Sequence, residues 1–283
     1  MDLDGLGCYA AIHGLDPGAL DERALQAVPV VALGRFCELF AAVGVKATLF
    51  AIGAEVGLPG AARVLKAAAG AGHEIASHTY GHDYALSRRP EKEISADLER
   101  CEQELLAAGL PGPRGVRAPG YTLSTTFLGA VRERGYLYDS SLLPSPPYYA
   151  AKAVAIAAYR LRGRDSRSIL GTPGQLFARR APHWLHGVRE LPIATVPALR
   201  FPVIGTTVLA LPGLARAGFA GGHLNLELHG IDALDRSDVP PEIAAVQPGL
   251  SMPASRKLLR LRAILARFDW QTLETVARRL LPD

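Results

Sequence analysis

The stretch that decides the fold reads His73-Glu74-Ile75-Ala76-Ser77-His78-Thr79-Tyr80-Gly81-His82. Its first half is an apolar run that predicts a buried strand, and its second half is a polar loop with two histidines four residues apart. Such residues share a face if the segment turns helically, and neutral imidazole is the commonest protein ligand for zinc. The pair therefore indicates a metal site after a strand, although two ordinary surface or core histidines explain the pair alone equally well.

The composition is that of a globular protein. The chain has 283 residues, of which 49% are hydrophobic and 20% charged, so neither disorder nor a coiled coil fits. This length allows one large α/β domain or two small ones. The formal net charge of +4 is mild, and no Lys/Arg run is interleaved with aromatic residues. We therefore expect no nucleic-acid partner.

The cysteines indicate a reducing compartment. Cys8, Cys37 and Cys101 are widely spaced and form no C-x-x-C, so neither a disulfide framework nor a zinc–thiolate site is expected. No run reaches the roughly 18 uninterrupted apolar residues of a membrane span, and no export signal is recognisable. These features predict a cytoplasmic protein, with contact at the inner face of a membrane as an extension of that prediction.

Strand and helix patterns alternate along the chain. The pattern predicts strands at 46–53, 72–78, 115–118 and 223–229, and helices at 25–43, 59–72, 90–108, 124–134, 255–268 and 272–281. Pro29 should interrupt the first helix. This alternation predicts βαβ units with the loops after the strands on one face, where active sites of such folds lie. Residues 144–222 are rich in proline and aromatic residues and are expected to form an irregular insertion or lid.

Two acids stand at the start of the chain, in Met1-Asp2-Leu3-Asp4-Gly5. On an extended segment Asp2 and Asp4 point the same way, so one could be a metal ligand and the other a base. Two surface acids at a terminus are the alternative. A central strand of about five residues should precede such a motif. We therefore expect the first strand to be truncated here and the true start of the chain to lie upstream of Met1.

Two further polar motifs follow predicted strands. Arg117-Ala118-Pro119-Gly120-Tyr121 follows the strand at 115–118, where proline and glycine predict a tight loop with inward-pointing amides. Leu226-Glu227-Leu228-His229 ends the strict alternation of the strand at 223–229. Taken singly, the first motif reads as an ordinary turn with a surface arginine. Taken in order with the acids and the histidine pair, the motifs form one set.

This order of motifs resembles the polysaccharide deacetylase family, the family 4 carbohydrate esterases that share the NodB homology domain. The H-[ST]-x-x-H and R-x-P-G patterns are specific, whereas D-x-D and L-x-L-H are weak alone. The resemblance covers roughly residues 1–140 and 220–283 and implies a distorted (β/α) barrel with seven strands, and we expect residues 1–283 to form a single domain. A leucine separates the two aspartates, whereas the usual first motif has adjacent aspartates. This D-x-D spacing resembles the sub-branch that includes lipid-linked-sugar deformylases.

Residue by residue, the resemblance implies Asp4, His78 and His82 as metal ligands and Asp2 as the general base. Arg117 would hold the base, His229 would be the general acid, and the backbone N–H of Tyr121 would stabilise the oxyanion. The ion expected is Zn²⁺, with Co²⁺, Mn²⁺, Ni²⁺ or Fe²⁺ as alternatives. The same ligand set suits non-haem iron oxygenases, but the sequence shows no cosubstrate motif. The acid that should tune His229 has no clear position, and Asp139, Glu190 and Asp232 are the candidates.

The predicted reaction is hydrolysis of an N-acetyl or N-formyl amide on a sugar or lipid-linked sugar. The alternative is a carbohydrate-binding or scaffold protein on the same fold with a weakened site. Aromatic residues and arginines are interleaved in the 144–222 stretch, which suits a lid over a glycolipid at a membrane. The competing interpretation is a packed insertion with solvated charges. The interleaved residues are Tyr148, Tyr149, Phe177, Trp184, Phe201, Arg160, Arg162, Arg164, Arg167, Arg179 and Arg180.

Overall fold

A six-stranded sheet forms the centre of the protein, which is seen here in a computed structural model that describes residues 1–219 and 222–282. The strand order is β1-β2-β3-β4-β6-β5, and every neighbouring pair is parallel except β5 and β6, which form an antiparallel hairpin. The strands are β1 (Thr48–Ala51), β2 (Glu74–Ser77), β3 (Gly115–Val116), β4 (Tyr138–Asp139), β5 (His183–Leu185) and β6 (Val188–Glu190).

Two short segments continue the sheet beyond β1. Asp2 makes parallel bridges to Phe50 on one side and to His229 on the other, so the start of the chain lies between β1 and the segment that carries His229. On the far side of the sheet, the N–H of Ala194, which follows β6, donates to the carbonyl of Asn225 at 2.9 Å. Backbone hydrogen bonds thus connect β6 with β1 by way of these segments. The six named strands by themselves form an open sheet.

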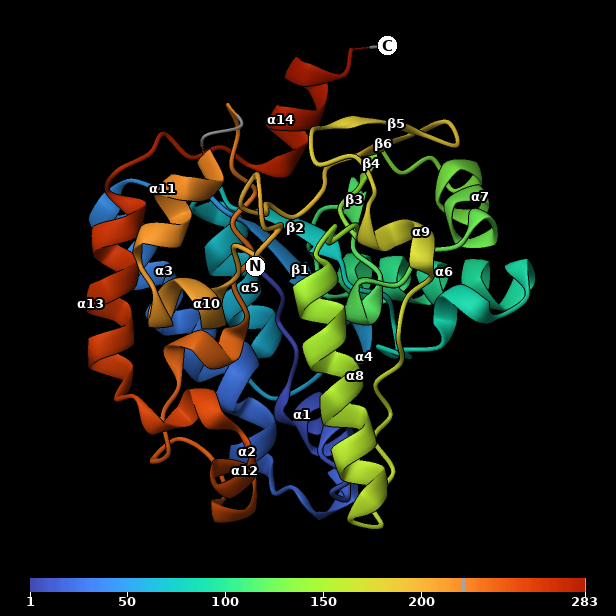
Figure 1. Ribbon diagram of the computed structural model, residues 1–283. Coiled ribbons are helices and arrows are strands. Elements are labelled where there is room, and N and C mark those ends of the chain that lie inside the picture. The colour runs from blue at the N-terminus through green and yellow to red at the C-terminus, as the bar shows by residue number, and fades with distance from the viewer. Residues whose placement is uncertain (220–221, 283) are drawn as a thin grey trace.

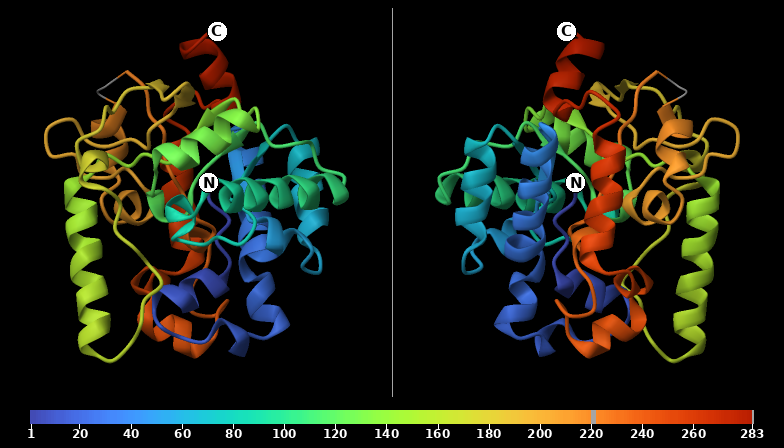
Figure 2. Two further views of the ribbon diagram at one scale, coloured as in Figure 1. Left: turned by 90° about the vertical axis from the view of Figure 1, so that its right-hand side faces the viewer. Right: turned by 90° about the vertical axis from the view of Figure 1, so that its left-hand side faces the viewer.

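Helices cover the sheet on its outside, in the α/β arrangement that the alternating pattern predicts (Figures 1 and 2). Helices follow each of the strands β1 to β4, and α5, α6 and α7 among them bury an apolar face against the core. They are α4 (Gly53–Val56), α5 (Ala61–Gly70), α6 (Glu91–Ala107), α7 (Thr125–Glu133) and α8 (Pro146–Leu161). The others are α1 (Leu6–Ile12), α2 (Glu22–Gln26), α3 (Leu33–Val43), α9 (Pro173–Leu176), α10 (Gly205–Ala210), α11 (Gly213–Phe219), α12 (Pro241–Val246), α13 (Ala254–Leu265) and α14 (Leu273–Leu280).

The first long helix is continuous from Glu22 to Val43, and the stretch Ala27–Ala32 between α2 and α3 is wound as a π-helix. Pro29 is accommodated there, so the expected interruption takes the form of a change in winding. By length and composition this helix could cross a membrane. Phe36 and Phe40 on it are buried in the main hydrophobic core.

The expectation of an irregular insertion at 144–222 needs correction. This stretch contains α8 to α11, and β6 within it pairs in parallel with β4, so it contributes a strand to the sheet. Strands of two or three residues between prolines are too short to show a period of two, which is why the sequence pattern missed them. The predicted strand at 223–229 makes only single bridges, at Glu227 and His229.

The two ends of the sheet are closed by different elements. Helix α14 lies across the end where the strands begin, whereas α1 and α8 lie towards the end where they finish (Figure 1). Two side chains from the strands cap α14: Thr48 Oγ1 accepts from the N–H of Leu273 at 2.8 Å, and Glu74 Oε2 accepts from the N–H of Glu274 at 3.0 Å. The predicted site residues lie either after β2 and β3 or at and just after the bridge residues Asp2 and His229, so they gather at the opposite end.

Candidate metal and catalytic site

Asp4, His78 and His82 come together at the end where the strands finish. One ligand atom from each lies within 4.8 Å of the others, and all three side chains are buried. His78 Nε2 is 3.0 Å from Asp4 Oδ1, and His82 Nε2 is 3.5 Å from Asp4 Oδ2. The sequence prediction of these three residues as one group therefore agrees with their positions.

A strained loop, and not a helical turn, brings the two histidines together. Thr79 and His82 have positive φ values of 65° and 49°, a conformation that costs about 1–3 kcal/mol per non-glycine residue. Neighbouring elements hold the loop in place. Asp97 of α6 accepts from the N–H groups of Tyr80 at 2.7 Å and Gly81 at 3.2 Å. The spacing argument assumed a helical turn, and that assumption was wrong. The two histidine side chains nevertheless converge.

The donor set fits a divalent ion. His78 Nδ1 lies 2.8 Å from the carbonyl of Arg117, which can only accept, so Nδ1 carries the proton and Nε2 presents a lone pair to the group. Both ring nitrogens of His82 and Oδ1 of Asp4 are buried without a hydrogen-bond partner among the described residues. Buried polar atoms without partners are costly. Bonds from these atoms to a cation would remove that cost.

Arg117 clamps Asp2 beside this group. Its Nη1 donates to Asp2 Oδ1 at 2.5 Å, while Nε and Nη2 donate to the carbonyl and hydroxyl oxygens of Ser140 at 2.7 and 2.9 Å. The guanidinium also lies 4.2 Å over the ring of Phe50. Asp2 Oδ2 is left facing His78 Nε2 at 3.8 Å. Burial alone would raise the pKa of Asp2, but the charge of Arg117 beside it acts the other way and that pKa is lowered, so the carboxylate is ionised.

His229 is paired with a carboxylate that the sequence analysis overlooked. Its Nδ1 lies 3.0 Å from Oε1 of the fully buried Glu227. Burial would lower the pKa of His229, but the ion pair with Glu227 outweighs burial and raises it to about 10. On a strand, residues two apart point to the same side, so the alternation in Leu226-Glu227-Leu228-His229 carried the signal. The ring is therefore protonated at neutral pH.

The three acids considered for this role lie elsewhere. Asp139 and Glu190 are register partners on β4 and β6, and they accept hydrogen bonds from Ser141 and Leu142. Asp232 accepts from the backbone N–H of His229 at 2.9 Å, so its contact is with the main chain of that residue. The acid beside the ring, which had no clear position in the sequence, is therefore Glu227 and none of the three candidates Asp139, Glu190 and Asp232.

Tyr121 closes the site opposite Asp2. Its hydroxyl is 3.2 Å from His229 Nε2, and its backbone has a positive φ of 60°. Gly120 before it also has a positive φ, and a Cβ there would lie 2.7 Å from the ring of Tyr84. The amide of Tyr121, predicted to stabilise an oxyanion, makes only a long bond of 3.4 Å to the carbonyl of Ala118. A stronger acceptor could therefore displace that bond.

Helix α8 holds this loop from outside. Tyr149 donates its hydroxyl to the carbonyl of Tyr121 at 3.0 Å, and Lys152 donates to the carbonyl of Gly120 at 3.1 Å. Tyr148 packs edge-on against Tyr121. Two aromatic residues assigned to a lid surface are thus supports of the site. Phe177, Trp184 and Phe201 are exposed at the surface, to 71%, 47% and 40%.

The sequence matches a family model. The model described as "Polysaccharide deacetylase" matches residues 28–138, which include the histidine pair and Arg117 to Tyr121. No curated protein matches the chain. The family model thus supports the polysaccharide deacetylase family, and the D-x-D sub-branch remains a prediction.

Solved structures share the fold. A candidate polysaccharide deacetylase from Mycobacterium smegmatis is 19% identical with a TM-score of 0.63, and the match covers 99% of this chain and 87% of that one. The Puue allantoinase is 18% identical with a TM-score of 0.52, covering 87% of this chain and 71% of that one. These matches confirm the predicted α/β fold of the NodB deacetylase type.

Proposed function

We propose that the protein is a metal-dependent hydrolase that removes an N-acyl group, acetyl or formyl, from an amino sugar or lipid-linked amino sugar. We propose further that residues 1–283 act as one polysaccharide deacetylase-like unit. The observation that carries this proposal is that two ion pairs, Asp2 with Arg117 and His229 with Glu227, lie beside the Asp4, His78 and His82 group. A clamped carboxylate and a protonated imidazole lie within reach of the same point, each with its own buried partner.

Asp4, His78 and His82 would hold the ion. One carboxylate and two imidazoles suit Zn²⁺, with Co²⁺, Mn²⁺, Ni²⁺ or Fe²⁺ as alternatives. A divalent ion bound there would supply Lewis-acid polarisation of the amide carbonyl and activation of water. The buried atoms of Asp4 and His82 that have no hydrogen-bond partner among the described residues support this ligand set.

Asp2 would act as the general base. One of its oxygens is fixed by Arg117, and the other faces the ligand group at 3.8 Å from His78 Nε2. Because its pKa is lowered, Asp2 is ionised at neutral pH and can take a proton from the attacking water. A low pKa makes a weak base, so the water must itself be activated. Arg117 would act as a positioning residue that keeps Asp2 aimed at that water.

His229 would act as the general acid. Its raised pKa of about 10, caused by Glu227, keeps the ring protonated at neutral pH. The C–N bond of an amide breaks only when nitrogen receives a proton, so Nε2–H would deliver it as the bond electrons move onto the amine. The products are then a free amino sugar and a carboxylic acid. The hydroxyl of Tyr121, 3.2 Å from Nε2, marks where the nitrogen would arrive.

Tyr121 would stabilise the oxyanion through its backbone N–H. The positive φ values of Gly120 and Tyr121 turn this peptide out of regular geometry, and α8 fixes it through Tyr149 and Lys152. A preorganised donor is effective because it needs no reorganisation when negative charge develops on the substrate oxygen. The long bond to Ala118 would be exchanged for one to that oxygen.

Peripheral membrane contact is proposed for the lipid-linked form of the substrate. The outer half of α8 exposes Val154 to 70% and Leu161 to 89%, next to Arg160, Arg162 and Arg164. Apolar side chains beside arginines suit anionic headgroups. Flotation with anionic vesicles at low salt tests this, using Arg160→Ser/Arg162→Ser/Arg164→Ser as the comparison. Equal flotation of both proteins, or none by either, would reject the membrane contact.

A substrate panel tests the function itself. N-acetyl and N-formyl amino sugars, free and lipid-linked, should be offered to the metal-loaded protein, with release of acetate or formate and of primary amine measured together. We expect equal amounts of acid and amine from at least one substrate. If substrates bind but none is cleaved at any loading of Zn²⁺, Co²⁺ or Ni²⁺, the alternative of a carbohydrate-binding protein on this fold is favoured.

A further inference from the structure

Helix α8 directs a partly buried cation at the rear of the proposed oxyanion donor. Lys152 Nζ donates to the carbonyl oxygen of Gly120 at 3.1 Å. That carbonyl and the N–H of Tyr121 belong to one planar trans peptide group, in which they point in opposite directions. The ammonium therefore contacts the far end of the same peptide group whose N–H faces the substrate oxygen in the proposed mechanism.

The charge of Lys152 has no acid beside it. Among the residues that the structure describes, no carboxylate forms an ion pair with this ammonium, and burial alone lowers its pKa, to about 8, so most of the side chain is protonated at pH 7. The ring of Tyr148, 5.8 Å from Nζ, is uncharged. Because no neighbouring negative charge cancels it, the field of the ammonium acts on the Gly120 carbonyl.

Glycine at position 120 allows this close approach. Gly120 has a φ of 63°, in the left-handed region that favours glycine. A Cβ at this position would lie 2.7 Å from the ring of Tyr84 and 3.3 Å from Lys152 Nζ. The lack of a side chain therefore leaves room for the ammonium next to the carbonyl oxygen.

Tyr149 contacts the next peptide group along the loop. Its hydroxyl donates to the carbonyl of Tyr121 at 3.0 Å, and that carbonyl shares a peptide group with the N–H of Thr122. Tyr149 and Lys152 are three residues apart on α8, so they lie on one face of the helix. Both side chains hold the loop, but only Lys152 contacts the peptide group that carries the Tyr121 N–H.

We propose that Lys152 is a positioning residue that polarises the Gly120–Tyr121 peptide group and so makes the Tyr121 N–H a stronger donor to the oxyanion, an inference that rests on the proposed function. A hydrogen bond to a carbonyl oxygen draws electron density from the peptide nitrogen, and linked bonds strengthen one another by about 10–30%. A charged donor makes a bond about twice as strong as a neutral donor does. The Tyr121 N–H is available to the substrate because its own bond, to the Ala118 carbonyl, is long at 3.4 Å.

Chemical shifts of the full chain test the polarisation without metal or substrate, so the result does not depend on whether deacylation is found. The ¹³C shift of the Gly120 carbonyl reports the bond from Lys152, and the ¹⁵N shift of the Tyr121 amide reports its transmission through the peptide group. In Lys152→Met both signals should move upfield. Tyr149→Phe, the matched control, should leave the Gly120 carbonyl in place and move the Tyr121 nitrogen less. An unmoved Tyr121 nitrogen in Lys152→Met, or an equal movement in both variants, would overturn the proposal.

Turnover of a cleaved substrate gives a second measurement. Loss of a whole oxyanion donor costs about 10²- to 10³-fold in kcat, so loss of about 10–30% of its strength in Lys152→Met should cost about two- to eightfold, with little change in KM. Lys152→Arg keeps the charge and should recover most of this loss. A loss that Lys152→Arg does not reduce, or one that appears in KM alone, would show that Lys152 only packs against the loop and would overturn the role of its charge.

Discussion

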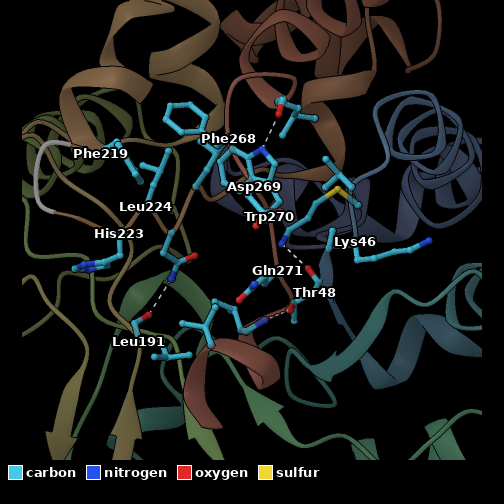
Figure 3. A pocket seen from close by; sticks show the side chains of 18 of the residues that line it. Lys46, Thr48, Leu191, Phe219, His223, Leu224, Phe268, Asp269, Trp270 and Gln271 are labelled. Carbon is cyan, nitrogen blue, oxygen red and sulfur yellow. Dashed lines mark hydrogen bonds between the residues drawn. The ribbon is translucent and has the colours of Figure 1, made fainter. Parts of the chain in front are cut away.

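The two ends of the same strands are built on opposite principles. Where the strands finish, charged groups are buried in pairs, Asp2 with Arg117 and Glu227 with His229, and the backbone around them is strained. Where they begin, apolar side chains such as Leu191 and Val276 line a cavity with charged ones at its rim (Figure 3), and the polar groups of Thr48 and Glu74 cap a helix. The buried charges and strained backbone at the first end lower the stability of the fold, whereas the packing and helix capping at the second end raise it. Changes at the first should therefore alter rate, and changes at the second should alter folding.

The largest effect on rate that leaves the ligand group intact is expected from Asp2→Asn. The amide cannot take a proton, so deacylation should fall by about 10²- to 10⁴-fold. Bound metal should stay at the level of the unchanged protein, because Asp4, His78 and His82 remain. Asp269→Asn, at the rim of the cavity, is the control and should keep full activity. A loss below tenfold in Asp2→Asn would remove Asp2 from the role of base.

Glu227→Gln should change the pH profile more than the structure. Without the carboxylate, burial dominates and the His229 pKa falls from about 10 towards or below its ordinary 6.5. The alkaline limb of the rate profile should then move to lower pH, with about a 10- to 100-fold loss at pH 8. An unmoved alkaline limb would show that His229 is not the proton donor.

The pair of Glu227 and His229 also predicts the direction in which the unfolding free energy changes with pH. His229 has a folded pKa above its unfolded value, so its stabilisation is fully present below about pH 6.5 and is lost as pH rises to about 10. Unfolding free energy of the unchanged protein should therefore fall between pH 7 and 10 by more than that of Glu227→Gln. Parallel curves from chemical denaturation would contradict the ion pair.

At the other end, Glu74→Ala should destabilise without slowing the enzyme. Glu74 accepts from Thr48 Oγ1 at 2.6 Å, from Tyr138 hydroxyl at 2.7 Å and from the Glu274 N–H. Losing these bonds should cost about 1–3 kcal/mol of unfolding free energy. The turnover of the folded fraction should stay unchanged. A change in kcat without loss of stability would show that the two ends are coupled.

The smallest effect is expected from Tyr121→Phe. The substitution keeps the backbone N–H proposed for the oxyanion and removes only the hydroxyl next to His229. We expect a loss of about two- to twelvefold in kcat, since the net value of one hydrogen bond is about 0.5–1.5 kcal/mol. A loss of 10³-fold would instead place the hydroxyl in the proton-transfer path.

The residues of the site could be predicted from the sequence more completely than the strands of the sheet. Motifs such as the histidine pair and Asp2-Leu3-Asp4 depend on residue type and order, and their side chains do converge. The strands β4 and β6 were missed because runs of two or three residues carry no readable period, and tertiary pairing alone makes them strands. Glu227 was not predicted because the acid was expected in the stretch after Tyr138, whereas Glu227 lies inside the Leu226–His229 motif itself.

The strained loop could not have been predicted either. The loop with positive φ at Thr79 and His82 is held by a hydrogen bond that Asp97 accepts and by bonds that the N–H groups at the start of α4 donate, and both partners are distant in sequence. The support of Tyr121 by α8 likewise depends on contacts between residues about 30 positions apart. Spacing rules describe local geometry, and these features are set by long-range contacts.

The central claim is that Asp4, His78 and His82 hold a catalytic metal ion, and metal content measured beside activity tests it most directly. After zinc loading and desalting, the unchanged protein should retain about one ion per chain, and so should the control His186→Asn, whose imidazole is exposed in the β5–β6 turn. His78→Ala and His82→Ala should lose both the ion and deacylation while keeping their circular dichroism spectrum. Full retention of one ion per chain in both alanine variants would contradict the account.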